Sequence, residues 1–131
     1  MVVMLPTSLC LTAAALVVNF WLTMRVGKLR QAHGVSVGDG GNEAIMRRMR
    51  AQLNFLEQTP LILLGIALVE MAGKGGAWLA PAGAAFIVGR VCHAIGMDGN
   101  FKAGRPIGML TGILLSLALV VVAVLISLGK M

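Results

Sequence analysis

Long apolar segments, separated by short charged or glycine-rich ones, constrain this chain most. The first runs from about Leu5 to Met24 without a charged residue. That is long enough to cross a bilayer, because a spanning helix needs about 20 apolar residues. Segments 77–97 and 106–128 are of similar length, whereas the apolar segment 61–72 is too short to cross alone, so the polar residues before it must extend the same helix. The sequence therefore predicts an all-α, integral membrane four-helix bundle.

Helix boundaries follow from turn chemistry. Gly34 to Asn42 reads as a glycine-rich loop, Asn42 suits a helix N-cap, and Pro106 suits a first helical turn. We predict helices over roughly residues 5–26, 43–72, 77–97 and 106–128. Four spans use roughly 80 residues, so residues 1–131 are expected to form a single domain.

Composition excludes several other classes of protein. Hydrophobic residues make up 58% of the chain and charged residues 12%, which argues against a soluble domain and against disorder. Two cysteines are too few for a disulfide scaffold. The net charge of +6 fits an anionic membrane surface or a small anionic ligand better than nucleic acid in a chain this apolar.

Basic residues are distributed unevenly between the two sides of the predicted bundle. Nine belong to the first and third loops and their flanks: Arg25, Lys28, Arg30, Arg47, Arg48, Arg50, Arg90, Lys102 and Arg105. Only Lys74 and Lys130 fall on the other side. Since positive residues stay on the cytoplasmic side, both termini are predicted to face away from the cytoplasm.

A polar stripe marks the second predicted helix. Arg47, Arg50, Asn54 and Glu57 are spaced three, four and three residues apart, which places them within an arc of about 80°. Ionised side chains facing lipid cost about 2.5 to 3.5 kcal/mol each on insertion scales. We therefore expect the stripe to face the bundle interior or a wet cavity.

The third predicted helix carries a matching polar pair, with Arg90 and His93 three residues apart. Basic residues near this end outnumber the acids there, and a surplus of guanidinium groups invites a small anion with carboxylates. Asn54 and Glu57 would add partners for an amide and an ammonium group. A peptide has all of these groups.

The run Arg50-Ala51-Gln52-Leu53-Asn54-Phe55-Leu56-Glu57, followed by Pro60, resembles the second-helix signature of the MAPEG family, the membrane-associated proteins of eicosanoid and glutathione metabolism. Gly89 to His93 on the third helix, and a polar loop ending in Arg105, resemble the same family. Segment 35–43 is similar to the first loop of its small bacterial members.

This resemblance implies a homotrimer in a bacterial inner membrane that binds glutathione between neighbouring subunits near the cytoplasmic face. The implied function is that of a glutathione-dependent transferase or peroxidase acting on an apolar electrophile or lipid hydroperoxide from the bilayer. Arg105 would face the thiol as the catalytic residue. The implied glutathione-binding residues are Arg50, Asn54, Glu57, Gln52, Arg30, Arg90, His93 and Arg47.

Three alternatives stay open at this point. The chain has no tyrosine, whereas family members commonly place tyrosines near the motif glutamate, so a catalytically silent relative is one. A small multidrug exporter would need an intramembrane carboxylate as proton carrier, which Glu57 or Glu70 could supply but the first helix could not. A haem-binding bundle would need axial ligands, and only His93 lies at membrane depth.

Overall fold

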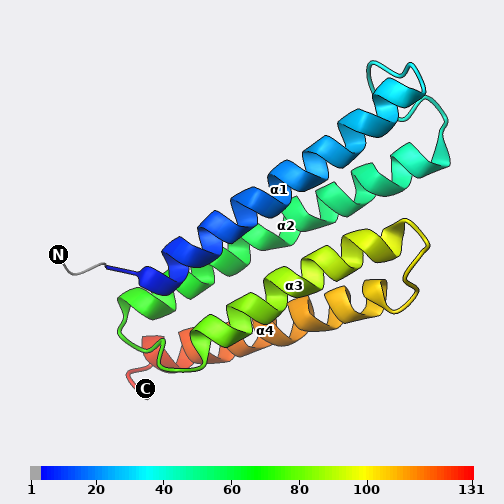
Figure 1. Cartoon of the computed structure of the whole chain (residues 1–131). Coiled ribbons are helices and arrows are strands. Elements are labelled where there is room, and N and C mark those ends of the chain that lie inside the picture. The colour runs from blue at the N-terminus through cyan, green and yellow to red at the C-terminus, as the bar shows by residue number, and fades with distance from the viewer. Residues whose placement is uncertain (1–3) are drawn as a thin grey trace.

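Four helices make up the computed structural model, which describes residues 4–131 and so leaves the first three residues of the expected domain outside. The helices are α1 (Pro6–Ala32), α2 (Glu43–Met71), α3 (Leu79–Met97) and α4 (Gly104–Ser127) (Figure 1). Each is long and apolar enough to cross a membrane, and residues 4–131 contain no strand. The predicted all-α fold and integral membrane character are confirmed.

Consecutive helices run antiparallel, so the start of α1 and the end of α4 lie at the same end of the bundle (Figure 1). The opposite end carries the connections 33–42 and 98–103, and we call it the two-loop end. Helices α2 and α3 each pack against all three other helices, whereas the backbones of α1 and α4 do not approach each other within the described residues. The core is centred on large buried side chains such as Leu22, Ile66 and Phe86.

The predicted end of the first helix, residue 26, is wrong, because α1 continues to Ala32. Its basic residues end the apolar segment without ending the helix, and two of them, Arg25 and Arg30, have polar partners. Arg25 pairs with Asp98, and Arg30 Nε donates to the Gly38 carbonyl at 2.8 Å. The chain leaves the helix at His33, and Gly34 follows with a φ of +66°.

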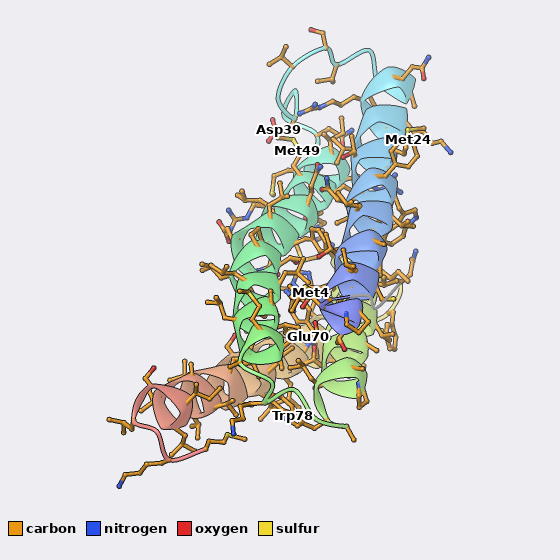
Figure 2. The ribbon with its side chains drawn as sticks, turned by 90° about the vertical axis from the view of Figure 1, so that its left-hand side faces the viewer. Met4, Met24, Asp39, Met49, Glu70 and Trp78 are labelled. Carbon is orange, nitrogen blue, oxygen red and sulfur yellow. The ribbon has the colours of Figure 1, made fainter. Side chains whose placement is uncertain are left out.

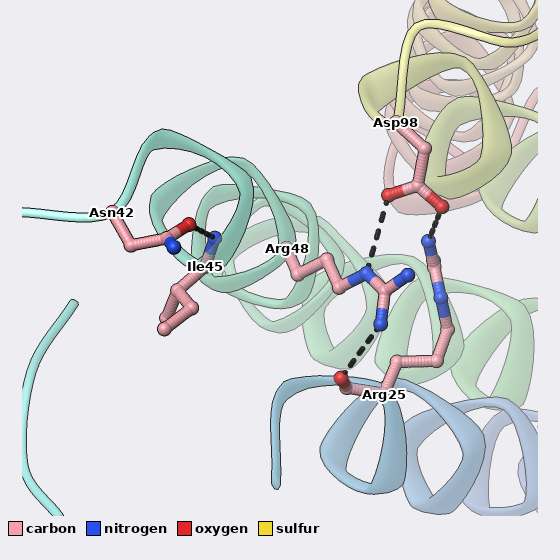
Figure 3. A network of polar contacts seen from close by, with 5 residues as sticks. All are labelled: Arg25, Asn42, Ile45, Arg48 and Asp98. Carbon is pink, nitrogen blue, oxygen red and sulfur yellow. Dashed lines mark hydrogen bonds and ion pairs between the residues drawn. The ribbon is translucent and has the colours of Figure 1, made fainter. Parts of the chain in front are cut away.

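Helix α2 begins as the sequence predicts. The Asn42 side-chain oxygen accepts a hydrogen bond from the Ile45 backbone N–H at 3.1 Å (Figure 3), which confirms the N-cap. Helix α4 starts two residues before its predicted position, at Gly104, and Pro106 lies in its first turn as expected. Helix α3 starts two residues late, at Leu79, after the turn that ends α2.

Helix α1 lacks a cap of its own and receives one from α2. Leu5, at the N-cap position, makes no side-chain capping bond. The Glu70 carboxylate instead accepts from the backbone N–H groups of Thr7 and Ser8, both at 2.8 Å, and from Ser8 Oγ at 2.6 Å. Figure 2 shows Glu70 beside the first turn of α1. One carboxylate thus fastens α2 to the N-terminus of α1.

Glycines allow α3 and α4 to approach closely. A Cβ atom on Gly108 would lie 2.5 Å from the His93 Cβ and 2.6 Å from the Gly89 carbonyl oxygen. At the two-loop end, a Cβ on Gly96 would lie 2.7 Å from the Arg105 backbone nitrogen. Small residues are the usual way in which membrane helices pack backbone to backbone. This close contact sets where the first turn of α4 lies relative to α3.

Candidate functional site between α2, α3 and α4

A hollow of about 280 Å³ opens near the two-loop end between three helices. Helix α2 contributes Arg50, Asn54 and Gln58; α3 contributes His93 and Met97; α4 contributes Arg105, Met109 and Ile113. We call this hollow the basic cavity. The structure thus brings together four of the predicted site residues, Arg50, Asn54, His93 and Arg105, from helices far apart in sequence.

No acidic side chain lines the basic cavity. Arg50 and Arg105 are exposed, and neither has an ion pair or side-chain hydrogen bond with any residue in 4–131. His93 is buried, with 7% of its surface exposed. Two guanidinium groups without protein partners therefore share one concave surface, and such groups bind carboxylates through paired, charge-assisted hydrogen bonds.

Arg90 lies behind the basic cavity instead of lining it. It is 2% exposed. Its Nη1 donates to Asn54 Oδ1 at 2.6 Å, its Nη2 donates to the Gly108 carbonyl, and its guanidinium carbon lies 5.3 Å from the centre of the Phe86 ring. Arg90 therefore joins α2, α3 and α4 from inside and fixes the orientation of the Asn54 amide. Arg90, one of the predicted binding residues, therefore supports the cavity from behind and is not among the residues that line it.

Arg30 and Gln52 lie around a second hollow, on the α1–α2 side of the chain. This hollow of about 400 Å³ is lined by Val26, Arg30, Met46, Met49, Arg50, Gln52, Leu53 and Leu56. The Gln52 amide donates to Thr23 Oγ1 at 2.8 Å. Arg50 is the one residue that lines both this hollow and the basic cavity.

The two ends of the predicted polar stripe, Arg47 and Glu57, do not reach the basic cavity. Arg47 lies near the start of α2 and pairs with Glu43 one turn away, its Nη2 lying 2.5 Å from Glu43 Oε1. Glu57 is exposed, on a face of α2 that also carries the exposed Leu53, Leu61 and Leu64. The expectation that the stripe faces an interior or a cavity holds for Arg50 and Asn54, and also for Arg47, which lines a separate hollow of about 430 Å³. Within this chain it does not hold for the exposed Glu57.

Gln58 and Met97 also line the basic cavity, although neither belongs to the predicted set of site residues. Gln58 could have been found, because it lies four and eight residues after Asn54 and Arg50 and so shares their helical face. Its side chain lies against Gly112, where a Cβ atom would be 2.6 Å from the Gln58 Oε1. Met97 is an apolar residue at the end of α3, and helical spacing does not single it out.

Comparison with known proteins gives one match. The family model described as the MAPEG family matches residues 8–125, which is nearly the whole chain. No curated protein and no solved structure matches the chain.

Proposed function

The chain belongs to the MAPEG family, and from this premise we propose that it is a membrane-bound, glutathione-dependent transferase or peroxidase whose thiol substrate binds in the basic cavity. The observation that carries the proposal is the pair of unpartnered guanidinium groups, Arg50 and Arg105, on a concave surface without acidic residues. The helices that form the cavity are long and apolar enough to cross a membrane, which supports a membrane-bound enzyme.

Glutathione fits the chemistry of the lining residues. It carries two carboxylates, one of which Arg50 can bind through two parallel hydrogen bonds, and amide groups that suit the polar side chains of Asn54 and Gln58. Arg90 holds the Asn54 oxygen at 2.6 Å, so the Asn54 amide nitrogen is turned to a fixed direction before any ligand arrives. Such preorganisation lowers the entropy cost of binding.

The basic cavity is small for a complete ligand pocket, which supports a site that a neighbouring subunit completes. About 280 Å³ is at the lower limit for ligand pockets, which usually measure about 300 to 1,000 Å³. Glu57, exposed among leucines on α2, would be costly to hold against lipid. A neighbouring copy in the expected homotrimer would cover Glu57 and bring its own Arg30 and Gln52 toward the ligand.

Arg105 is the proposed activating residue for the thiol. A cysteine thiol with a pKa near 8.5 is only a few per cent thiolate at pH 7, and the thiolate is the nucleophile. A guanidinium beside the sulfur favours the charged form. The resulting thiolate adds to an apolar electrophile that enters from the bilayer. In peroxide reduction, two glutathione molecules supply the two electrons and become the disulfide.

Binding is tested by calorimetric titration of glutathione into the purified protein in detergent. Charged hydrogen bonds contribute about 1.5 to 3 kcal/mol each, so Arg50→Ala should weaken binding at least about tenfold. Lys102→Ala serves as a control, because it removes an exposed positive charge from the same end without lining the cavity. An unchanged dissociation constant for Arg50→Ala would contradict the proposed site.

A catalytically silent glutathione-binding relative is the second candidate, favoured by the absence of tyrosine from the chain. Turnover separates the two. A chloronitrobenzene reports on conjugation, because the carbon–sulfur bond forms as chloride leaves. Binding without turnover, for this probe and for a lipid hydroperoxide, would favour the silent relative. A proton-coupled exporter is less well supported, because Glu70, one of its two candidate proton carriers, is engaged as the cap of α1.

A further inference from the structure

One carboxylate at the two-loop end holds three helices together. Asp98 directly follows α3, and its Oδ2 pairs with Arg25 of α1. Its Oδ1 lies 3.5 Å from Arg48 Nε of α2, and Arg48 Nη1 in turn donates to the Arg25 carbonyl at 2.9 Å. Figure 3 shows the two arginines converging on Asp98 from different helices. We call these three residues the Asp98 network.

The Asp98 network is partly shielded from solvent. The side chains of Arg25 and Asp98 are 12% and 23% exposed. The Arg25 guanidinium carbon also lies 4.6 Å from the centre of the Trp21 ring, within range of a cation–π contact. Among the ion pairs in residues 4–131, the two that share Asp98 are the ones that join the α1–α2 pair of helices to the α3–α4 pair.

The end of α3, just before Asp98, packs closely against the start of α4, where Arg105 lies. Gly96, two residues before Asp98, lies so close to the Arg105 backbone nitrogen that a Cβ atom there would be 2.7 Å away. Within the turn, the Gly99 N–H donates to the Gly96 carbonyl at 3.1 Å, and the Gly104 N–H donates to the Phe101 carbonyl at 3.0 Å. We therefore expect a shift of the end of α3 to move the first residues of α4 with it.

We propose that Asp98 is a positioning residue for Arg105: by fastening the end of α3 to Arg25 and Arg48, it holds the Arg105 guanidinium at the basic cavity. The backbones of α1 and α4 do not approach each other within the described residues. The network therefore links α1 to the start of α4 through the end of α3. The expected effect on catalysis rests on the proposed function. The coupling between the end of α3 and the start of α4 does not depend on that function.

The substitution that tests this is Asp98→Asn, which keeps the shape and one acceptor oxygen but removes the charge. A displacement of about 1 Å at a reacting group can cost about 100-fold in rate. We expect conjugation of the chloronitrobenzene to slow by about tenfold or more and the pKa of bound glutathione to rise, with the glutathione dissociation constant changed by less than about twofold. Asp39→Asn, which removes a carboxylate from the first loop at the same end, should change none of these.

A double-mutant cycle with Arg105→Ala identifies the route of the effect. If Asp98 acts through Arg105, Asp98→Asn causes no further loss of rate once Arg105 is absent. Fully additive losses, or a loss of affinity that matches the loss of rate, would overturn the proposal. Arg48→Gln provides a milder second variant should Asp98→Asn not fold, and it should slow conjugation in the same direction.

Hydrogen exchange in the ligand-free protein separates this proposal from the proposed function. Backbone amides of residues 99–105 should exchange faster in Asp98→Asn than in the unmodified protein, while amides near Glu70 at the opposite end stay unchanged. Faster exchange in a protein that does not bind glutathione would retain the mechanical link and reject the proposed function. Unchanged exchange would reject the link itself.

Discussion

Replacing Glu70 by glutamine should destabilise the bundle at the end opposite the basic cavity. The Glu70 carboxylate accepts from two backbone N–H groups of α1 at 2.8 Å and from Ser8 Oγ at 2.6 Å. Glutamine offers one acceptor oxygen, so at least one backbone N–H loses its partner, which costs about 1 to 3 kcal/mol. The lost charge at a helix N-terminus adds about 0.3 to 2 kcal/mol.

These contributions give about 1 to 5 kcal/mol for Glu70→Gln. Because Glu70 is only half-buried, water can take up some of the lost bonds, and we expect about 1 to 3 kcal/mol. Ser8→Ala removes the hydroxyl bond alone and should cost about 0.5 to 1.5 kcal/mol. The two losses should not add fully, since both variants disrupt the same contact.

The measurement is reversible unfolding in mixed micelles by increasing amounts of dodecyl sulfate, followed by far-ultraviolet circular dichroism. Glu43→Gln is the control, because Glu43 forms an exposed ion pair with Arg47. The Glu43 side chain is 69% exposed and the Arg47 side chain 45%, so the pair should contribute less than about 1 kcal/mol. A loss below about 0.5 kcal/mol for Glu70→Gln would refute the capping argument. Glutathione affinity should be unaffected in the folded protein.

Further predictions concern catalysis, topology and packing. Arg105→Ala should raise the pKa of the bound thiol and slow conjugation of an apolar electrophile more than it weakens glutathione binding; a collapse of affinity at unchanged pKa and rate would make Arg105 a carboxylate ligand instead. In intact cells, an impermeant thiol reagent should label Lys74→Cys but not Ser36→Cys in a chain lacking both native cysteines, and the reverse would invert the predicted orientation. Gly108→Val should cost about 1 to 3 kcal/mol of unfolding free energy through overpacking, whereas Gly27→Ala, where an added Cβ meets nothing within 4 Å, should cost nothing in the same titration.

Sequence alone predicted the number and order of the helices, because apolar length and turn chemistry act locally. Asn42 is a clear example: a residue with a side-chain acceptor after a glycine-rich loop caps α2 as expected. The end of α1 was predicted six residues too early, since a loss of hydropathy marks where a membrane segment ends and not where helical hydrogen bonding ends. Past residue 26, Arg30 donates to the Gly38 carbonyl in the loop that follows, a contact that hydropathy does not register.

The candidate site was predictable to the same extent. Helical spacing correctly placed Arg50 and Asn54 on one face of α2, and both line the basic cavity. Spacing cannot say how far along α2 the neighbouring helices extend, so it grouped Arg47 and Glu57 with them. Helical spacing also could not reveal that Arg90 donates hydrogen bonds to Asn54 and to the Gly108 carbonyl. That arrangement depends on how the neighbouring helices pack against α3.

The close packing of α3 against α4 has a consequence for how the protein enters the membrane. Helix α3 brings the buried Arg90 into the bundle, and an isolated arginine at the centre of a spanning helix costs about 2.5 to 3.5 kcal/mol on insertion scales. Helix α4 is the most apolar of the four and offers the Gly108 carbonyl to that arginine. We therefore expect the translocon to release α3 and α4 together as a helical hairpin, with α3 held back until its partner has been synthesised.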